Sequence, residues 1–472
     1  MRRSALVSIA VLLTLVAGCR AAVRGPAVTT TAISHATKHR APDVASAPAA
    51  YRADLDPAVR AWIDRTLPSW VDRYEHLHAH PELSLAEHAT SALVAAELGR
   101  AGYRVTTGVG GTGVVGVLAN GPGPVVLVRG DMDALPVREE TGLPYASRVT
   151  ATLPDGNATG VMHACGHDVH TTSLLAVATL LSEMRTHWRG TIVAVAQPAE
   201  ELGRGADAMI RDGLFTRFPK PNACVALHVS ADLAAGDVGV TPGFHMANVD
   251  SVDVTIYGRG GHGARPHEAV DPIVTAAYVV TALQTLVSRR VDPVEPAVVT
   301  VGAIHGGTKH NVIPDQVTLQ LTVRSFRAEV RRTLLDGIAE ITTDVCAAFG
   351  CPRPPLVKVK EEGTPAAYND PGLAAAARDV FTAAFGPAAV VERRPEMGGE
   401  DFGRYAVAAN VPGFMFRLGS VDRAALAASG KPGGAPLPSL HSSRYAPTPA
   451  PTLATGIRAL AHLVLSVLAS PE

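Results

Sequence analysis

The chain has 472 residues, of which 47% are hydrophobic and 18% are charged, so it can bury a sizeable core. Its length allows about two to four domains. Lys and Arg total 42 and Asp and Glu total 43, and the formal net charge of -1 argues against a general nucleic-acid-binding protein, which would carry a basic excess. The 5 Cys, an odd number, argue against a disulfide scaffold.

Residues 1–18 are predicted to be a signal peptide. Two Arg residues follow the first Met, and Ala5 to Val16 form an apolar segment too short to span a bilayer of roughly 30 Å as a helix. The segment ends in Val-Ala-Gly-Cys, which resembles the lipobox of bacterial lipoproteins. We therefore expect Cys19 to be lipidated and the protein to be exported and anchored to the outer face of the cell membrane. The alternatives are an ordinary secretory signal cleaved nearby and an uncleaved anchor.

A flexible linker is predicted for residues 19–50, which are rich in Ala, Thr and Pro and have no apolar periodicity. Residues 51–242 are predicted to form the first part of a larger α/β domain. After an opening helical segment, strands alternate with helices, an order that favours a largely parallel sheet. The expected elements are a helical stretch from Val59 to Leu98, strands at Val114–Ala119 and Val125–Val128, a helix at Cys165–Met184, and strands at Thr191–Gln197 and Ala223–His228.

The pattern changes over residues 243–357, which are predicted to form a second, inserted domain. Its elements are a strand at Val249–Tyr257, a helix at Ala269–Val287, strands at Ala297–Ala303 and Val317–Val323, and a helix at Ala328–Phe349. This β-α-β-β-α order is typical of a ferredoxin-like α+β sandwich. Residues 358–472 return to the α/β pattern and end in a helix at Pro451–Leu468, so we predict that they complete the larger domain.

Side chains suited to metal binding collect at the ends of predicted strands and in loops, where α/β proteins place their sites. They lie in the segments Arg129–Pro136, Met162–Asp168 and Gln197–Glu201, at His228, and in Pro438–Ser443. Thiolate, imidazole and carboxylate groups hold divalent transition metals, and two ions about 3.5–4 Å apart can share one water. Of two adjacent Glu residues, one can bind metal while the other stays free as a base.

Each feature has a simpler explanation when it is taken alone. A Cys-x-His pair is more often a buried thiol beside a surface His, and a Glu-Glu pair is usually a solvated loop. A His at a strand end is more often a hydrogen-bonded core residue, and Asp131 and Asp133 would serve as loop caps. These explanations fail together, because all the features fall at matching strand ends of one α/β framework.

The chain from about Trp70 to its end resembles the M20 metallopeptidases, in particular the amidohydrolase branch of aminoacylase-like and hippurate-hydrolase-like enzymes. Seven motifs in family order carry the resemblance: His78–Ser84, Gly130–Pro136, His163–Asp168, Gln197–Glu201, Gly260–His267, Asn311–Asp315 and Gly398–Phe402. The resemblance implies a catalytic α/β domain interrupted by an α+β domain. In many relatives the inserted domain is a dimerisation surface and in others it is only a lid, which leaves a homodimer open.

The resemblance also implies a role for each matching residue of the larger domain. It implies two divalent metal ions per subunit, and the ligands that match are Cys165, His167, Glu201, His228 and His441. Cys165 occupies the place of a bridging ligand, and a Cys ligand favours zinc while leaving manganese and cobalt open. Glu200 matches the general base. Asp133 matches an acidic residue that orients a site group from behind the ligands.

In the inserted domain, His262 matches a residue that reaches the scissile carbonyl, in some relatives from the partner subunit. Asn311 and Arg324 match residues that hold a substrate carboxylate, for which the planar fork of Arg is suited. The implied reaction is hydrolysis of N-acyl amino acids or small peptides by an activated water, with Glu200 as base. A carboxypeptidase or dipeptidase is one alternative. The other is a non-catalytic surface lipoprotein that binds peptides or amino-acid conjugates, which would tend to lose Glu200 or a ligand.

Two features fall outside these roles. His441 is followed by Ser442 and Ser443, where the family often has Ser-Pro. Cys224, Cys346 and Cys351 have no assigned role and are expected to be buried or free thiols, with a disulfide between Cys346 and Cys351 as the alternative.

Overall fold

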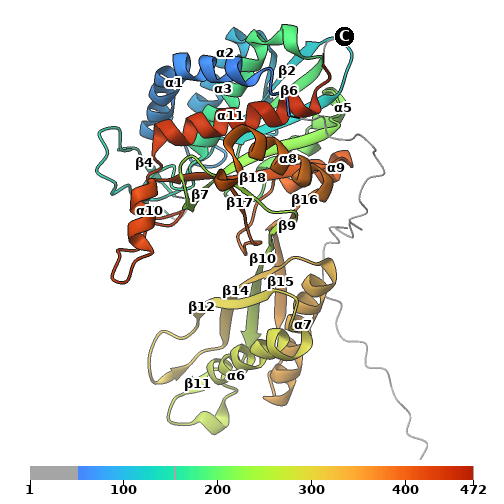
Figure 1. Cartoon of the computed structure of the whole chain (residues 1–472). Helices are drawn as coiled ribbons and strands as arrows, with labels where there is room; N and C mark the ends of the chain where they lie inside the picture. The colour runs from blue at the N-terminus through green and yellow to red at the C-terminus, as the bar shows by residue number, and fades with distance from the viewer. Residues whose placement is uncertain (1–50, 154–155, 471–472) are drawn as a thin grey trace, which may run out of the picture.

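The computed structural model describes residues 51–153 and 156–470, so the predicted signal peptide, the linker and Cys19 lie outside the described residues. The described chain forms a larger domain around an eight-stranded sheet and an inserted domain around a four-stranded sheet (Figure 1). The two domains are connected beside a two-stranded ladder of β9 (Gly243–Met246) and β16 (Ala367–Asn369).

The sheet of the larger domain has the strand order β1-β2-β6-β3-β7-β18-β8-β17. Its strands are β1 (Arg104–Val109), β2 (Gly113–Asn120), β3 (Val125–Asp131), β6 (Gly190–Gln197), β7 (Ala223–Ala234), β8 (Val238–Val240), β17 (Val390–Glu392) and β18 (Gly413–Val421). The four central strands, β6, β3, β7 and β18, are parallel to one another. Antiparallel pairs join β1 to β2, β2 to β6 and β18 to β8. The predicted α/β fold with a largely parallel sheet is confirmed.

Helices cover both faces of this sheet because successive strand residues point to opposite sides. In β3, Val126 and Val128 belong to a hydrophobic core with α1, α2, α3, α8 and α11, whereas Leu127 belongs to a second core with α4, α5 and α9. The helices of this domain are α1 (Asp56–Ala79), α2 (His88–Arg100), α3 (His167–Glu183), α4 (Gly205–Arg211), α5 (Leu214–Arg217), α8 (Pro371–Phe385), α9 (Gly403–Ala409), α10 (Arg423–Ser429) and α11 (Pro449–Val467).

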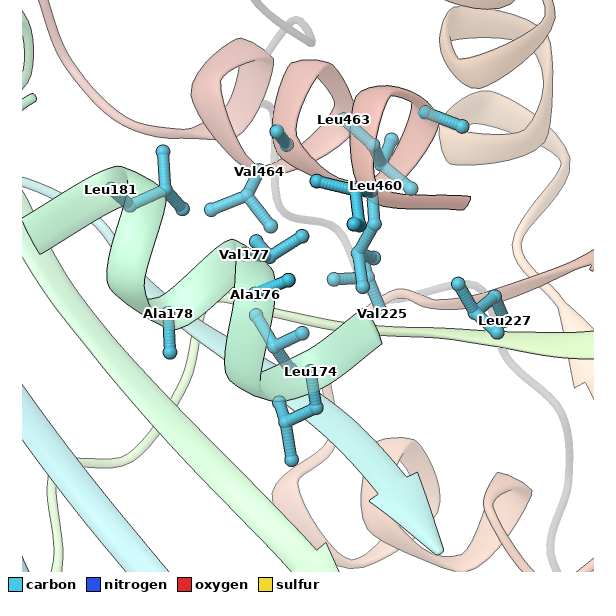
Figure 2. Close-up of a cluster of buried hydrophobic side chains, with 14 of the residues drawn as sticks. Leu174, Ala176, Val177, Ala178, Leu181, Val225, Leu227, Leu460, Leu463 and Val464 are labelled. Atoms are coloured by element: carbon cyan, nitrogen blue, oxygen red, sulfur yellow. The ribbon is translucent and has the colours of Figure 1, made fainter. Parts of the chain in front are cut away.

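The packing of α3 against α11 lies at the centre of the first core. Val177 of α3 faces Leu460 and Val464 of α11 (Figure 2). Among the described residues, α11 is the one helix long and apolar enough to cross a membrane, with a mean hydropathy of 1.3. Because 72% of that apolar window is buried in the domain, α11 has the position of a core helix.

The inserted domain has the strand order β12-β14-β10-β15, with every pair antiparallel. Its elements are β10 (Asn248–Tyr257), α6 (Pro272–Thr285), β12 (Ala297–His305), β14 (Gln316–Ser325), α7 (Ala328–Ala348) and β15 (Leu356–Thr364). The two helices share one hydrophobic core with the sheet. This is the ferredoxin-like arrangement predicted from the sequence. Its fourth strand, β15, extends past residue 357, at which the sequence analysis divides the two domains.

The helical stretch expected from Val59 to Leu98 is interrupted in the structure: α1 ends at Ala79 and α2 begins at His88. The backbone N–H groups of Ala89 and Thr90, in the first turn of α2, donate to the Glu82 carboxylate at 3.0 and 2.8 Å, so the second helix has its own start. The short strands β4 (Thr150–Thr152), β5 (Ala158–Gly160), β11 (Gly261–His262) and β13 (Val312–Ile313) were not predicted.

Candidate metal centre

The structure brings five of the predicted side chains together at the end of the central strands. Cys165 lies two residues before His167, which is the first residue of α3. Glu201 follows β6, His228 lies in β7, and His441 lies in the loop before α11. Two groups that could hold a metal ion share the Cys165 thiol, one with His167 and His228 and the other with Glu201 and His441. In each group the ligand atoms lie within 4.8 Å of one another. A shared sulfur is the arrangement that a bridging ligand requires.

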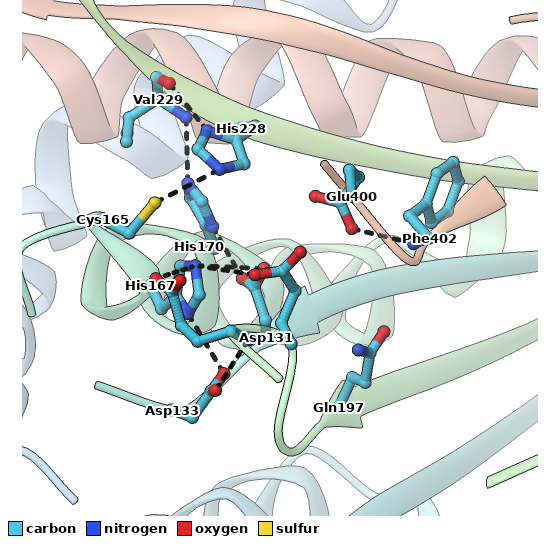
Figure 3. A network of polar contacts seen from close by, with 12 residues as sticks. Asp131, Asp133, Cys165, His167, His170, Gln197, His228, Val229, Glu400 and Phe402 are labelled. Carbon is cyan, nitrogen blue, oxygen red and sulfur yellow. Dashed lines mark hydrogen bonds and ion pairs between the residues drawn. The ribbon is translucent and has the colours of Figure 1, made fainter. Parts of the chain in front are cut away.

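The tautomer of His228 suits a metal ligand. Its Nδ1 donates to the carbonyl oxygen of Val229 at 2.8 Å, which leaves a lone pair on Nε2. That Nε2 lies 3.7 Å from the Sγ of Cys165 (Figure 3). His228 therefore presents an acceptor nitrogen to the same point as the thiol.

His167 is held from behind by Asp133. Its Nδ1 lies 3.2 Å from Asp133 Oδ1, while its Nε2 lies 3.8 Å from Glu201 Oε1 and 3.9 Å from Glu200 Oε2. The second oxygen of Asp133 accepts the Ser84 hydroxyl at 2.6 Å and the backbone N–H of Glu201 at 3.0 Å. One buried carboxylate thus fixes the His167 ring and the backbone beside it, which is the position predicted for Asp133.

The electrostatics of the centre fit a divalent cation. Burial raises the pKa of the Cys165 thiol well above its ordinary value, and burial raises the pKa of Glu201 to about 7. Burial and the nearby charge of Glu400 also raise the pKa of Glu200. The Nε2 of His167 and the Oε1 of Glu201 are buried with no hydrogen-bond partner among the described residues. A cation among these sulfur, nitrogen and oxygen donors would stabilise their anionic forms.

His441 completes the second group from a loop that is tied to the same place. Its backbone N–H donates to the carbonyl oxygen of Ala164 at 2.8 Å, and its Nε2 lies 3.6 Å from Glu201 Oε2. Its backbone has φ of +67°, in the left-handed region that non-glycine residues rarely adopt. The side chain remains 55% exposed, so this donor lies at the open side of the centre.

Comparison with known proteins identifies the family. A sequence profile described as Peptidase family M20/M25/M40 matches residues 127–464. The chain belongs to this family. Among its relatives, the N-acetyl-L-cysteine deacetylase of Bacillus subtilis is 40% identical over 347 residues, which make up 73% of this chain and 79% of that protein. The thermostable carboxypeptidase 2 of Saccharolobus solfataricus is 37% identical over 348 residues, 73% of this chain and 84% of that protein.

A solved structure agrees with this assignment. The YXEP protein of Bacillus subtilis, described as a dinuclear metal-binding peptidase of the M20 family, matches with a TM-score of 0.68 and 28% sequence identity. The match covers 85% of this chain and 98% of that protein. The protein is therefore an M20 metal-dependent hydrolase, and its clustered donors have the composition of a dinuclear metal site.

A buried polar network behind the ligands of this M20 enzyme was missed by the sequence analysis. His170 Nδ1 lies 2.6 Å from Asp131 Oδ1, and His170 Nε2 accepts the backbone N–H of Val229 at 2.9 Å. Asp131 also contacts the buried Arg129, whose Nη1 lies 2.6 Å from its Oδ2. The available signal was the spacing of His170 three residues after His167, which places both on one side of α3. The network links β3, α3 and β7 behind the metal centre (Figure 3).

The lid residues predicted for the M20 site are not brought to the metal centre of the same chain. His262 in β11 and Asn311 beside β13 are exposed neighbours, and the Gly263 N–H donates to the Asn311 carbonyl oxygen at 2.8 Å. Their ladder lies at the end of the inserted domain remote from the larger domain (Figure 1). Arg324 is half-buried in β14 and donates to the Met397 carbonyl oxygen at 3.4 Å, near the domain junction.

Proposed function

We propose that this M20 hydrolase cleaves the amide bond of N-acyl amino acids or small peptides, with Cys165, His167, Glu201, His228 and His441 as metal ligands. The observation that carries the proposal is the pair of donor groups that share the Cys165 thiol. Divalent ions held there would supply a Lewis acid and lower the pKa of a water molecule. The Cys ligand favours zinc, whereas manganese and cobalt are the alternatives, because metal loading follows availability as well as affinity.

Glu200 acts as the general base in this proposal. It adjoins Glu201 and is absent from both groups that share Cys165, although it belongs to two other donor groups, one with His167 and Glu201 and one with Glu400 and Asp401. In the proposal its carboxylate takes a proton from water and passes it to the leaving amine. Burial and the charge of Glu400 raise its pKa well above its ordinary value, which makes the carboxylate a stronger base. Asp133 keeps the His167 ring in place during the reaction.

The test of the base is Glu200→Gln, which keeps the size of the side chain and removes its basicity. We expect turnover of an N-acetyl amino acid to fall by about 10²- to 10⁴-fold while the bound metal stays near the wild-type content. Glu201→Gln is the matched variant and should instead lower metal content. Wild-type turnover in the Glu200 variant would refute the assignment.

The two relatives are named for different activities, one as an N-acetyl-L-cysteine deacetylase and the other as a carboxypeptidase. We propose N-acyl amino acids, whose free carboxylate would be held by the guanidinium fork of Arg324 and by the amide of Asn311, which, like its neighbour His262, would come from a second copy of the chain. N-acetyl amino acids, hippurate and dipeptides should be assayed side by side at equal enzyme concentration. Efficient turnover of dipeptides alone would replace this proposal with the dipeptidase alternative.

We further propose a homodimer in which His262 of one copy stabilises the oxyanion at the metal centre of the other. Two observations support the homodimer. His262 lies far from the metal centre of its own chain, and β12 is an edge strand of the four-stranded sheet in the inserted domain. Exposed apolar side chains occur on the same domain, among them Ile273, Val274, Tyr278, Ile304 and Val312.

Complementation tests the dimer. Glu200→Gln and His262→Ala are each expected to be nearly inactive alone. Mixed dimers would contain one intact site, so co-expression should restore about a quarter of wild-type activity if the chains pair at random. Absence of recovery in dimers shown to be mixed would refute the crossed arrangement.

The leader sequence supports a proposed location on the outer face of the cell membrane, with Cys19 lipidated. The wild-type protein is expected in the membrane fraction, and Cys19→Ser is expected in the soluble fraction. Retention of the Cys19 variant in the membrane would favour an uncleaved anchor.

A further inference from the structure

We propose that Glu87 is a positioning residue that holds the loop carrying Glu200 and Glu201 in its reactive conformation. The inference rests on the proposed function, since it names the group that supports the proposed base. Glu87 is a fully buried carboxylate, 0% exposed, at the end of the loop between α1 and α2. The roles described above do not include it.

The Glu87 carboxylate joins three separate segments of the chain. Its Oε1 accepts the backbone N–H of Ala199 at 2.8 Å and that of Leu85 at 3.0 Å. Its Oε2 accepts the hydroxyl of Thr112, from the turn between β1 and β2, at 2.5 Å. The contact with Ala199 is the important one, because Glu200 is the next residue.

Both backbone donors have an unusual conformation. Leu85 has φ of +68° and Ala199 has φ of +48°, and these are two of the four non-glycine residues with positive φ among the described residues. The left-handed region is unfavourable for a residue with a Cβ atom and persists where the surroundings impose it. A single oxygen of Glu87 accepts hydrogen bonds from both of these strained positions.

The carbonyl side of Ala199 is fixed as well. Its carbonyl oxygen accepts the N–H of Gly205 at 3.1 Å, and the backbone carbonyl oxygen of Glu200 accepts the N–H of Gly203 at 2.6 Å. A Cβ atom on Gly205 would lie 1.6 Å from the Pro198 oxygen, so the turn is closely packed. Glu87 therefore supplies the acceptor for the N–H group of Ala199, while the turn itself holds the carbonyl group of the same residue.

Loss of Glu87 would leave the buried N–H of Ala199 without this acceptor and would release its strained dihedral angles. Rotation about those angles moves the carboxylate of Glu200 relative to His167, whose Nε2 is now 3.9 Å from it. Displacements of about 1 Å at a reacting group can cost about 10²-fold in rate. The effect is expected in kcat, because the substrate-holding residues lie elsewhere.

The experiment measures kcat, KM and metal content on an N-acetyl amino acid. Glu87→Ala should lower kcat by about 10- to 100-fold with KM and metal content near wild type. Glu87→Gln should retain most of kcat, because its amide oxygen can still accept both N–H groups. The double variant Glu87→Ala/Ala199→Gly should recover part of kcat, because glycine adopts positive φ without a Cβ penalty.

Glu82 provides a matched control in the same loop. Its carboxylate accepts two backbone N–H groups at the start of α2, so Glu82→Ala should lower stability without the loss of kcat. If Glu87→Ala does not fold, Glu87→Asp, which shortens the side chain by one methylene, serves in both the single and the double variant.

An unchanged kcat in folded Glu87→Ala or Glu87→Asp would overturn the inference, and so would a failure of Ala199→Gly to restore any activity. Wild-type and Glu200→Gln proteins belong in the same assay. No hydrolysis by the wild type would refute the proposed function, whereas an active wild type, an inactive Glu200 variant and a fully active Glu87 variant would refute this inference alone.

Discussion

Arg129→Met should destabilise the larger domain strongly, because Arg129 lies fully buried among acidic groups. Its guanidinium Nη1 is 2.6 Å from Asp131 Oδ2, and its Nη2 is 2.9 Å from Glu400 Oε1 and 3.3 Å from Asp401 Oδ1. Its Nε donates to the Gln197 side-chain oxygen at 2.9 Å. A methionine of similar length would fill the space without supplying any of these contacts.

The size of the effect follows from the carboxylates that remain. Removal of one partner of a buried ion pair costs about 3–5 kcal/mol, because the other charge stays buried without compensation. Burial raises the pKa of Asp131, and the charge of Arg129 is the largest influence that holds it well below its ordinary value. We therefore expect a loss of about 3–5 kcal/mol, from a total that is commonly about 5–15 kcal/mol.

Urea unfolding followed by far-UV circular dichroism would measure this loss. Arg378→Met is the matched control, since Arg378 forms an exposed ion pair with Glu392 at 3.3 Å and should contribute less than about 1 kcal/mol. The loss of unfolding free energy in Arg129→Lys should fall between those of Arg129→Met and Arg378→Met, because Lys keeps the charge and lacks the planar fork. A free energy of unfolding within about 1 kcal/mol of wild type in Arg129→Met would refute the electrostatic account of this network.

Two further predictions use other parts of the same domain. Burial lowers the pKa of His78, but Asp168 at 2.7 Å and Glu139 at 3.1 Å raise it from 6.5 to about 10. The stabilisation from its positive charge is therefore fully present below pH 6.5 and is lost as the pH rises through about 10. The difference in unfolding free energy between wild type and His78→Ala should shrink over that pH interval. A constant difference would contradict the assignment. Gly205→Ala places a Cβ atom 1.6 Å from the Pro198 oxygen and should cost roughly 1–3 kcal/mol and reduce kcat; wild-type values in thermal unfolding and in the hydrolysis assay would show that the turn is not tightly packed.

The central strands and the inserted domain were predictable from the sequence because their hydrophobic patterns are strong. β3 and β6 are nearly continuous apolar runs, as strands covered on both faces must be. β1 (Arg104–Val109) was missed because it is an edge strand with a half-buried Thr106, an exposed Thr107 and little apolar signal. The break between α1 and α2 depends on the Glu82 carboxylate, whose position relative to Ala89 and Thr90 only the folded loop determines.

The donors of the candidate site were predictable because thiol, imidazole and carboxylate groups follow successive strands. Their arrangement in space was harder to predict from the sequence, because the sharing of Cys165 between two groups depends on the distance between the end of β6 and the loop of His441. The contacts of Arg129 with Glu400 join residues 271 positions apart, and no local pattern records them. His262 matches a family motif, but a motif does not say whether the residue serves its own chain or a second copy.

Removal and return of metal tests the proposed function most directly. Chelator-treated protein, verified as metal-free, should lose hydrolysis of N-acetyl amino acids, and addition of zinc, manganese or cobalt should restore it. Glu200→Gln, reloaded with the same metal, should remain inactive. Full hydrolysis by the metal-free protein, or no hydrolysis with any of the three metals, would contradict a metal-dependent amidohydrolase.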